Sequence, residues 1–245
     1  MTATGHDWRP LLAADGFVLL RSVLTADEVR GVIADWDAVR ARNAADPAIL
    51  ADDRGPAYGA RNLLRMWPAV VGLARRSGLL GPLLAVLGPD AGVVRVLFFD
   101  KPPGHSWALP WHKDHTVAVA EHRPSVVFTK PTTKAGVPHV EAPTELLDRM
   151  VTARVHLDDM TDENGPLRVI PGSHRRSDGE GAPVTVRCRA GDVLLMRPLL
   201  THGSGHCRPD TARHRRIVHL ECAPSVEMPD GYRWHDFVSL ANGPA

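Results

Sequence analysis

Cysteine, charge of one sign and long apolar runs are all scarce in this sequence of 245 residues. Its three cysteines, Cys188, Cys207 and Cys222, form no CxxC pair and are odd in number, which fits a reducing cytoplasm. No apolar run approaches the roughly 20 residues that cross a bilayer, and residues 1–10 lack the basic-then-apolar order of a signal peptide. These absences argue against a membrane-spanning protein, and we expect a cytoplasmic one.

The charged residues are balanced, with 29 Lys and Arg against 28 Asp and Glu and a formal net charge of +1. Such a chain has no overall basic field for nucleic acid and no polybasic anchor for a membrane. Its hydrophobic content of 44% is enough to bury a sizeable core. We therefore expect a single domain over residues 1–245 with neither nucleic acid nor membrane as a partner; the sequence does not predict the oligomeric state.

The N-terminal part, residues 1–90, is predicted to be mainly helical. A short apolar strand over residues 15–20 comes first. A helix then begins after Thr25, which has the spacing of a capping box to Glu28, so that each side chain can satisfy a free amide. Apolar residues at helical spacing carry this helix to about Ala41.

Two further segments complete this part. Residues 45–60 are acidic and non-periodic, and they predict a loop. A second helical region is predicted over residues 68–87, interrupted near Gly78 and ended by Gly88.

From residue 91 the sequence changes to short β-rich segments separated by Gly and Pro turns. Helices followed by many short strands predict a mainly β fold, a sandwich or barrel with flanking helices packed outside. Residues 129–150 interrupt the strands, carry a predicted short helix over 144–150 and are expected to form a lid. The strands predicted in this core, residues 91–223, are 93–99, 111–119, 151–157, 167–170, 192–196 and 215–221.

One of these predicted strands contains His112, Lys113 and Asp114. Side chains alternate along a strand, so His112 and Asp114 would project to the same face. One segment could then give an imidazole and a carboxylate to a metal ion, and a distant His would complete the facial triad of non-haem Fe(II) oxygenases. Taken alone, an HxD triplet in a chain with 13 His is equally compatible with a surface His and Asp on an edge strand.

The third ligand has four candidates. His202 follows the apolar strand over residues 192–196 and precedes a Gly turn, where a side chain can face an interior cavity. His206 lies beyond that turn in a polar loop, His219 in a strand, and His174 in a Pro-Gly-Ser-His stretch. Each of them, taken singly, could also be a hydrogen-bonded or exposed histidine without a metal.

Arg213, Arg215 and Arg216 follow His202 by about one hairpin. An Arg that points into an apolar barrel needs a partner, and a dicarboxylate would provide one because guanidinium binds carboxylate in a bidentate manner. Arg213 and Arg215 would share one strand face and Arg216 would lie on the other. For Arg216 we favour a solvated basic turn.

These elements, taken in order, resemble the phytanoyl-CoA dioxygenase family of Fe(II)/2-oxoglutarate-dependent oxygenases. The resemblance covers most of the chain, from Asp15 to Glu221. Its most specific element is the stretch Asn-Gly-Pro-Leu-Arg-Val-Ile-Pro-Gly-Ser-His over residues 164–174. The other elements are Asp15-Gly16-Phe17-Val18, Lys101-Pro102-Pro103, Trp111-His112-Lys113-Asp114, Gly191-Asp192-Val193, His202-Gly203-Ser204-Gly205 and Arg215-Arg216-Ile217-Val218-His219-Leu220-Glu221.

The resemblance implies a double-stranded β-helix, a cupin-like jelly roll with flanking helices. By motif, His112, Asp114 and His202 would be the catalytic residues that bind iron. Lys113 stands where the family commonly has Gln, and we expect it to project away from the metal. Asp114 is present where related halogenases have a small residue that makes room for chloride, which favours hydroxylation-type chemistry over halogenation.

The resemblance also implies a site for the cosubstrate 2-oxoglutarate. An Arg after His202 would bind its distal carboxylate; the trailing motif favours Arg215 and the usual spacing favours Arg213, and we rank Arg215 first. Lys101 and Ser204 match positions that contact this cosubstrate in parts of the family, although Lys101 could equally lie at a strand end in water.

Fe(II), 2-oxoglutarate and O2 are therefore the expected cofactor and cosubstrates, with ascorbate as a helpful additive. The expected reaction is hydroxylation of an unactivated C–H bond of a small-molecule metabolite, with release of succinate and CO2. The same cofactors also support desaturation, cyclisation or epimerisation. Two other interpretations stay open: a small-molecule-binding barrel that has lost catalysis, and a zinc or manganese cupin-like isomerase or hydrolase.

The sequence does not predict the identity of the substrate. Residues 129–150, residues 45–60 and the segment around Trp234 are expected to shape the pocket. The candidate substrate contacts, each equally compatible with a structural role, are Trp107, His139, Glu141 and Arg154.

Overall fold

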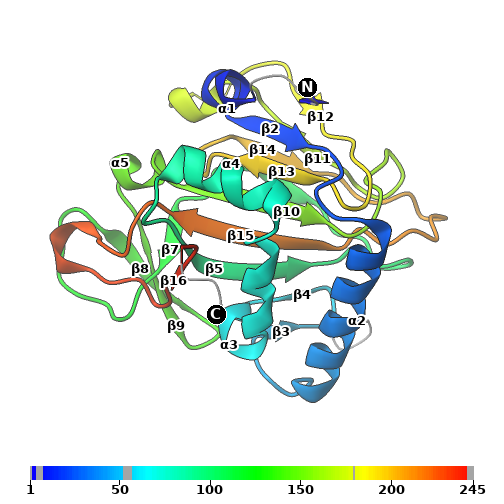
Figure 1. Cartoon of the computed structure of the whole chain (residues 1–245), viewed down its shortest axis with the longest axis horizontal. Helices are drawn as coiled ribbons and strands as arrows, with labels where there is room; N and C mark the ends of the chain where they lie inside the picture. Colours follow the sequence, from blue (N-terminus) through cyan, green and yellow to red (C-terminus); the bar gives the residue numbers. More distant parts are fainter. Residues whose placement is uncertain (1, 4–7, 52–56, 179, 242–245) are drawn as a thin grey trace.

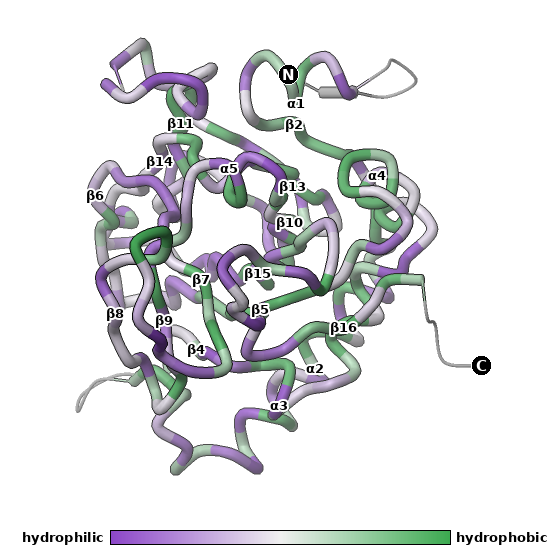
Figure 2. The backbone as a smooth tube through the Cα atoms, turned by 90° about the vertical axis from the view of Figure 1, so that its left-hand side faces the viewer, coloured by the Kyte–Doolittle hydropathy of each residue, from purple (hydrophilic) through white to green (hydrophobic). Residues whose placement is uncertain are grey.

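The computed structural model describes residues 2–3, 8–51, 57–178 and 180–241. Helices cover one face of a large β-sheet, and two smaller sheets lie on the other side of that sheet (Figures 1 and 2). The molecule therefore has three layers in this order: the helices, the large sheet and the two small sheets. The polar side chains of the candidate site project between the sheets.

The described chain contains five α-helices, and none of its helices is long and apolar enough to span a bilayer. Three short 3-10 helices accompany them. The helices are α1 (Arg9–Asp15), α2 (Ala26–Arg42), α3 (Leu63–Met66), α4 (Ser77–Leu87), α5 (Thr144–Leu147), η1 (Pro68–Leu73), η2 (Ser173–Arg175) and η3 (Pro229–Gly231).

The helix start predicted at Thr25 is confirmed. The Thr25 hydroxyl accepts a hydrogen bond from the Glu28 amide, 3.2 Å away, and the Glu28 carboxylate accepts one from the Thr25 amide, 2.7 Å away. Helix α1, by contrast, is not predicted from the sequence, because its seven residues are too few to display a periodic apolar face.

The helical region predicted over residues 68–87, with an interruption near Gly78, is confirmed except for the exact place of the interruption. The segment consists of η1 and α4, separated by residues 74–76. The break falls at Arg76, whose backbone is extended with ψ of 140°, and not at Gly78, which lies inside α4. The predicted end is correct, since Gly88 follows α4 with a φ of 91° that favours glycine.

The large sheet of the described chain has nine strands, most of them antiparallel. The centre is formed by β13, β10, β15 and β5, which pair in that order. In sheet order the strands are β1 (Thr2–Ala3), β2 (Phe17–Leu20), β13 (Val193–Met196), β10 (Val151–His156), β15 (Ile217–Ala223), β5 (Gly92–Phe99), β4 (Gly59–Ala60) and β3 (Ile49–Leu50), with β16 (Val238–Ser239) also paired to β5.

Two smaller sheets complete the fold. One has the order β12-β11-β14-β6 and the other β7-β9-β8. The strands of the first are β12 (Val184–Thr185), β11 (Leu167–Val169), β14 (His202–Ser204) and β6 (Leu109–His112); those of the second are β7 (Thr116–Ala118), β9 (Val137–Glu141) and β8 (Thr129–Lys134).

Three predicted segments differ from the structure. The strand predicted over residues 111–119 is two strands, β6 and β7, which belong to different sheets because the chain leaves strand geometry at residues 113–115. The loop predicted over residues 45–60 contains the paired strands β3 and β4, and its residues 52–56 lie outside the described part. Residues 129–150 form the hairpin β8–β9 before α5, and the predicted helix over 144–150 ends at Leu147.

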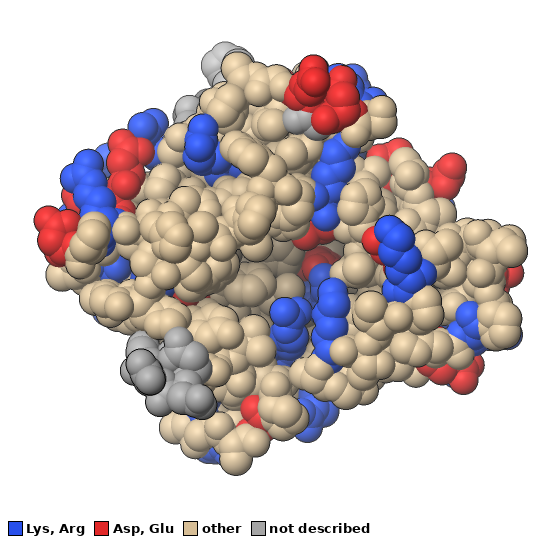
Figure 3. All heavy atoms as spheres, turned by 180° about the vertical axis from the view of Figure 1, so that it is seen from behind, with Lys and Arg blue, Asp and Glu red and all other residues tan. Residues whose placement is uncertain are grey.

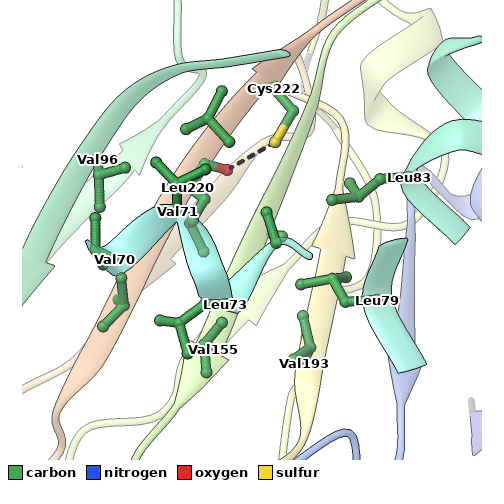
Figure 4. Close-up of a cluster of buried hydrophobic side chains, with 14 of the residues drawn as sticks. Val70, Val71, Leu73, Leu79, Leu83, Val96, Val155, Val193, Leu220 and Cys222 are labelled. Carbon is green, nitrogen blue, oxygen red and sulfur yellow. Dashed lines mark hydrogen bonds between the residues drawn. The ribbon is translucent and has the colours of Figure 1, made fainter. Parts of the chain in front are cut away.

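The two faces of the large sheet have opposite character. On the outer face, side chains of β10, β15 and β5 such as Val155, Leu220 and Val96 pack against η1 and α4 in an apolar core (Figure 4). On the inner face the same strands carry buried polar side chains, namely Arg95, Thr152, Arg154, His156, His219 and Glu221. Because side chains alternate along a strand, one set of strands provides both a hydrophobic core and a polar interior.

The inner space is closed at one end by apolar side chains. Leu194 and Met196 of β13 pack there against Leu167 and Val169 of β11, together with Phe17 of β2. All five are buried. The polar interior is therefore confined to the region around β5, β10, β15, β6 and β14.

Candidate metal centre

The predicted metal ligands His112, Asp114 and His202 come from two paired strands and the turn after one of them. β6 ends at His112 and β14 begins at His202, and these two residues are direct partners in the ladder. Asp114 lies two residues beyond β6, and its amide donates to the carbonyl of Pro198, 2.9 Å away. This bond turns the segment after β6 toward the start of β14.

The structure brings these three side chains together. Their candidate ligand atoms all lie within 4.8 Å of one another. Nε2 of His112 is 3.8 Å from Oδ1 of Asp114, and Nε2 of His202 is 3.7 Å from Oδ2 of the same carboxylate. Imidazole and carboxylate atoms lie about 2.0–2.2 Å from a zinc-sized cation, so one ion can bridge each of these pairs.

Both imidazoles are oriented by the backbone. Nδ1 of His112 is 2.8 Å from the carbonyl of Pro110, and Nδ1 of His202 is 2.8 Å from the carbonyl of Leu200. With a proton on each Nδ1, the Nε2 atoms near Asp114 keep free lone pairs. Burial lowers the pKa of His202 to about 4, and the charge of Asp114 only partly opposes this, so the ring is neutral near pH 7.

Asp114 provides the oxygen donor. Burial raises the pKa of its carboxyl, but His202, His219 and His112 outweigh this effect and hold the pKa below its ordinary value. Within the described chain, its buried Oδ2 has no hydrogen-bond partner. An ionised carboxylate with an unsatisfied oxygen between two imidazoles fits a divalent cation, and two nitrogens with one carboxylate are the donor set of non-haem Fe(II) sites.

The Pro-Gly-Ser-His stretch, residues 171–174, packs next to this cluster and fixes the backbone beside His202. The Ser173 hydroxyl accepts from the amide of Thr201, 2.8 Å away and adjacent to His202. The Ser173 carbonyl accepts from Nζ of Lys113 at 2.9 Å, and the carbonyl of Arg176 accepts from the same ammonium at 2.5 Å. Lys113 therefore extends toward η2 and away from the three candidate ligands, as expected from its place between His112 and Asp114.

The other three histidines considered as ligands lie elsewhere. His206 is exposed, with Nδ1 3.3 Å from the Ser106 hydroxyl. His174 packs against Gly16, at the end of α1. His219 is inside the barrel, but its Nε2 lies 3.6 Å from the Glu221 carboxylate and not among the candidate metal ligands.

A second group of buried side chains consists of three cations, Lys101, Arg154 and Arg215, which are 0%, 5% and 2% exposed. Nζ of Lys101 donates to the hydroxyl of Ser204 at 3.1 Å and to the carbonyl of Gly205 at 2.6 Å. Lys101 and Arg215 also share a neighbour, since their charged atoms lie 4.8 and 5.8 Å from the ring centre of Trp107.

These cations have no counter-ion of their own. Among the described residues no carboxylate forms an ion pair with any of the three, and the Nε atoms of Arg154 and Arg215 have no hydrogen-bond partner. Burial and the charge of Arg215 lower the pKa of Lys101 to about 7, and burial and the charge of Arg154 lower the pKa of Arg215 to about 9. Buried unpaired charge is costly, so this group fits an anionic ligand.

The Asn-Gly-Pro motif builds one wall of this cationic group. The Asn164 amide nitrogen donates to the carbonyls of Asp159 and His214, which fixes the loop to the segment just before Arg215. NH1 of Arg215 in turn donates to the carbonyl of Gly165, 2.9 Å away. Gly165 has a φ of 63°, and a Cβ there would lie 2.8 Å from Nζ of Lys101, so a larger residue would displace that ammonium.

Arg213 and Arg215 are separated by the fold. The expectation that they share a strand face is wrong, because β15 begins only at Ile217. Arg215 is buried, whereas Arg213 is exposed, with Nε 3.5 Å from the Glu163 carboxylate. The solvated turn expected for Arg216 is also wrong, since its half-buried guanidinium pairs with Asp158 at 2.6 Å.

Sequence reasoning missed a chain of buried contacts on the inner face. Arg95 of β5 forms an ion pair with Glu221 of β15. NH1 of Arg154 lies 3.3 Å from Nδ1 of His219, whose other nitrogen faces Glu221. His156 is also fully buried, and neither of its ring nitrogens has a partner among the described residues. His156 could have been identified from the sequence, because it lies two residues after Arg154 on the same strand and therefore on the same face.

The remaining candidate substrate contacts have partners. Trp107 is half-buried and donates from Nε1 to the carbonyl of Asp100, 3.2 Å away. His139 is buried, with Nδ1 2.9 Å from the carbonyl of Val137. Glu141 forms an ion pair with Lys130 at 2.9 Å. Of this set, Trp107 alone contacts the cationic group.

The sequence profile of the phytanoyl-CoA dioxygenase family matches residues 12–215, a span that includes all six residues of the two clusters. The chain belongs to the phytanoyl-CoA dioxygenase family. The family membership predicted from the motifs is thus confirmed.

The individual proteins that resemble this chain are distant from it in sequence. An ectoine dioxygenase from Streptomyces anulatus is 27% identical over 168 residues, which cover 66% of this chain and 48% of that protein. The chain therefore spans about half the length of this curated relative. EctD from S. alaskensis, solved with 2-oxoglutarate and 5-hydroxyectoine, aligns with a TM-score of 0.69 and 20% identity over 92% of this chain and 79% of that one.

A third protein extends the comparison. The non-haem alpha-ketoglutarate-dependent carbocyclase SnoK from nogalamycin biosynthesis aligns with a TM-score of 0.67 and 18% identity, covering 93% of this chain and 89% of that one. These likenesses confirm the predicted double-stranded β-helix with flanking helices.

Proposed function

We propose that the protein is an Fe(II)- and 2-oxoglutarate-dependent dioxygenase that hydroxylates an unactivated C–H bond of a small metabolite. The observation that carries the proposal is the combination of two clusters: two imidazoles and a carboxylate within 4.8 Å, and three buried cations without a counter-ion. The family and the ectoine dioxygenase relative support the same activity.

In this proposal His112, Asp114 and His202 hold Fe(II). Fe(II) held by only these three side chains would keep room in its coordination shell for the cosubstrates. Bound Fe(II) supplies the oxidative decarboxylation of 2-oxoglutarate by O2, which releases succinate and CO2, and the oxidising power that removes a substrate hydrogen. The backbone carbonyls of Pro110 and Leu200 keep both imidazole rings oriented for binding.

The buried cations hold the cosubstrate. Arg215 binds the distal carboxylate of 2-oxoglutarate, because it is buried, lacks a carboxylate partner and can form a bidentate contact. Lys101 and Ser204, which already share a hydrogen bond, contact the same carboxylate. Arg213 takes no part, since it is exposed and lies beside Glu163.

The walls of the proposed site exclude water from the reaction. Trp107 lies over the charged groups of Lys101 and Arg215. Residues 129–150 act as a lid in this proposal, because β9 pairs with β7 directly after Asp114. A dry site strengthens the electrostatic contacts that position 2-oxoglutarate.

The cyclisation alternative keeps some support, because the carbocyclase SnoK shares the fold. Desaturation and epimerisation use the same residues. The ligand of the proposed enzyme is a small molecule and not nucleic acid or a membrane, and the three free, buried cysteines favour the cytoplasm as its location.

The proposal is tested by incubating the protein with Fe(II), ascorbate, 2-oxoglutarate and a metabolite library, followed by mass spectrometry. We expect O2-dependent succinate and a product that gains one oxygen atom. Loss of two hydrogens would indicate desaturation or cyclisation. Bound iron without succinate would favour the non-catalytic barrel, and turnover with zinc or manganese but without 2-oxoglutarate would favour a cupin-like isomerase or hydrolase.

A further inference from the structure

Two further cations, Lys134 and Arg61, lie near the metal centre and are not part of the proposed cosubstrate site. Nζ of Lys134 donates to the hydroxyl of Thr116, 3.3 Å away. The side chains of Thr116, Asp114 and Glu221 line one small internal space. The ammonium group of Lys134 is therefore one side chain away from a candidate metal ligand.

Arg61 is held next to Lys134 by its neighbour in the chain. The side-chain amide of Asn62 donates to the carbonyl of Ala135, 3.3 Å away, which fixes residues 61–62 against the end of β8. Both Arg61 and Lys134 are half-buried. The charge of Arg95 acts on each of them, and, after burial itself, lowers the pKa of both side chains.

The charges around Lys134 and Arg61 do not balance. Glu221 is already paired with Arg95, and Glu141 is already paired with Lys130. Among the residues that the structure describes, no carboxylate forms an ion pair with Arg61 or Lys134. Figure 3 shows the face opposite α2 and α4 hollowed near its centre, with acidic atoms in the hollow and Lys and Arg around it.

The two groups of unpaired cations are distinct. Arg154 belongs to the proposed cosubstrate site and contacts His219. His219 contacts Glu221, and Glu221 is paired with Arg95, whose charge acts on Lys134. A single 2-oxoglutarate anchored by Arg215 leaves Lys134 and Arg61, at the other end of this series of contacts, without an anion. Unpaired, partly buried cations beside a reaction centre favour a second anionic ligand.

Building on the proposed function, we propose that the substrate carries an anionic oxygen group, a carboxylate or a phosphate ester, which Lys134 and Arg61 bind. This contact orients the rest of the substrate toward His112, Asp114 and His202. The buried ion pair of Arg95 and Glu221, whose Glu221 lines the same small space as Asp114 and Thr116, keeps this region rigid.

The test uses matched probes that differ in charge. The pairs are octanoate and octanamide, 3-phenylpropanoate and 3-phenylpropanamide, and glucose 6-phosphate and glucose. Each is added without O2 to protein loaded with Fe(II) and 2-oxoglutarate, and the change in the visible charge-transfer absorption is titrated. The same probes are followed by saturation-transfer NMR with metal-free protein, which reports binding even without a metal centre.

We expect the anionic member of at least one carboxylate or phosphate pair to bind about tenfold more tightly than its neutral partner. Lys134→Met and Arg61→Gln should each remove this preference. Lys130→Met is the matched control and should retain it, because Lys130 is exposed and paired with Glu141. The pair that responds distinguishes a carboxylate from a phosphate substrate.

Equal binding of charged and neutral probes, binding of neither, or an equal loss in the Lys130→Met control would overturn the proposed substrate class. Absence of the charge-transfer absorption before any probe is added would instead count against the proposed Fe(II)/2-oxoglutarate function. If the NMR signal of the anionic probes still depends on Lys134 in that case, the anion site stands without the oxygenase.

Discussion

The outer and inner faces of the large sheet are made by the same strands and have opposite compositions. On β15, the outward Val218, Leu220 and Cys222 are fully buried in apolar surroundings. The inward His219 and Glu221 are also buried but contact charged groups. The comparison indicates that the outer face supplies the stability that allows the inner face to keep buried charge, which costs free energy until ligands arrive.

The strongest test of the difference between the two faces is to remove a candidate metal ligand from the inner side of the sheet. His202→Ala should abolish Fe(II) binding and 2-oxoglutarate turnover, because two donors remain where the proposed site needs three. Metal content and succinate formation are measured, with circular dichroism as a check on folding. His206→Ala is the control and should keep both, since His206 is exposed beside Ser106. Turnover that survives in His202→Ala would contradict the ligand assignment.

A substitution on the outer face should lower the stability of the protein and leave its handling of 2-oxoglutarate unchanged. Leu220 is 0% exposed, and Leu220→Ala should lower the free energy of unfolding by about 2–5 kcal/mol through lost burial and a cavity. The Michaelis constant for 2-oxoglutarate should not change in the folded fraction. Chemical denaturation and steady-state kinetics check the two expectations, and a large change in that constant would show that the faces are not independent.

A smaller effect separates two arginines that lie two residues apart. Arg215→Met should weaken 2-oxoglutarate binding by about 2–3 kcal/mol, because a charge-assisted contact is lost in a buried site. Arg213→Met should leave binding unchanged, since Arg213 is exposed and beside Glu163. Titration of the Fe(II) protein with 2-oxoglutarate measures both. Equal losses in the two variants would place the cosubstrate elsewhere.

The smallest effect is a dependence on pH. The pKa of Lys101 is lowered from 10.5 to about 7 by burial and by Arg215, so the empty site loses this proton as the pH rises above about 7. A dicarboxylate favours the protonated form, so 2-oxoglutarate binding should weaken with rising pH by at most about tenfold per unit. Lys101→Met should bind more weakly and lose this slope between about pH 7 and 9. A slope that persists in the variant would assign it to another group.

Much of the fold could be predicted because the decisive signals are local. The capping box at Thr25 depends on a spacing of three residues, and the strand that became β5 depends on a run of β-branched and aromatic residues. The inward direction of Arg154 and His156 follows from alternation once the strand is known. The family motifs added the double-stranded β-helix as the architecture of the strands.

The site was harder to predict because it depends on where strands end. His112 and Asp114 were expected on one strand, yet β6 ends at His112 and a hydrogen bond to Pro198 turns Asp114 inward. Which of Arg213 and Arg215 is buried depends on the loop before β15, because β15 begins only at Ile217. Alternation of side chains applies only within a strand and cannot predict this difference. Lys134 gave no signal at all, because its place beside Thr116 depends on contact between two strands of another sheet.

The most direct test of the account is an anaerobic structure of the protein with Fe(II) and 2-oxoglutarate. The account predicts one iron held by His112, Asp114 and His202, with the distal carboxylate of the cosubstrate on Arg215. Iron bound by any other set of side chains, or a distal carboxylate on Arg213, would contradict it.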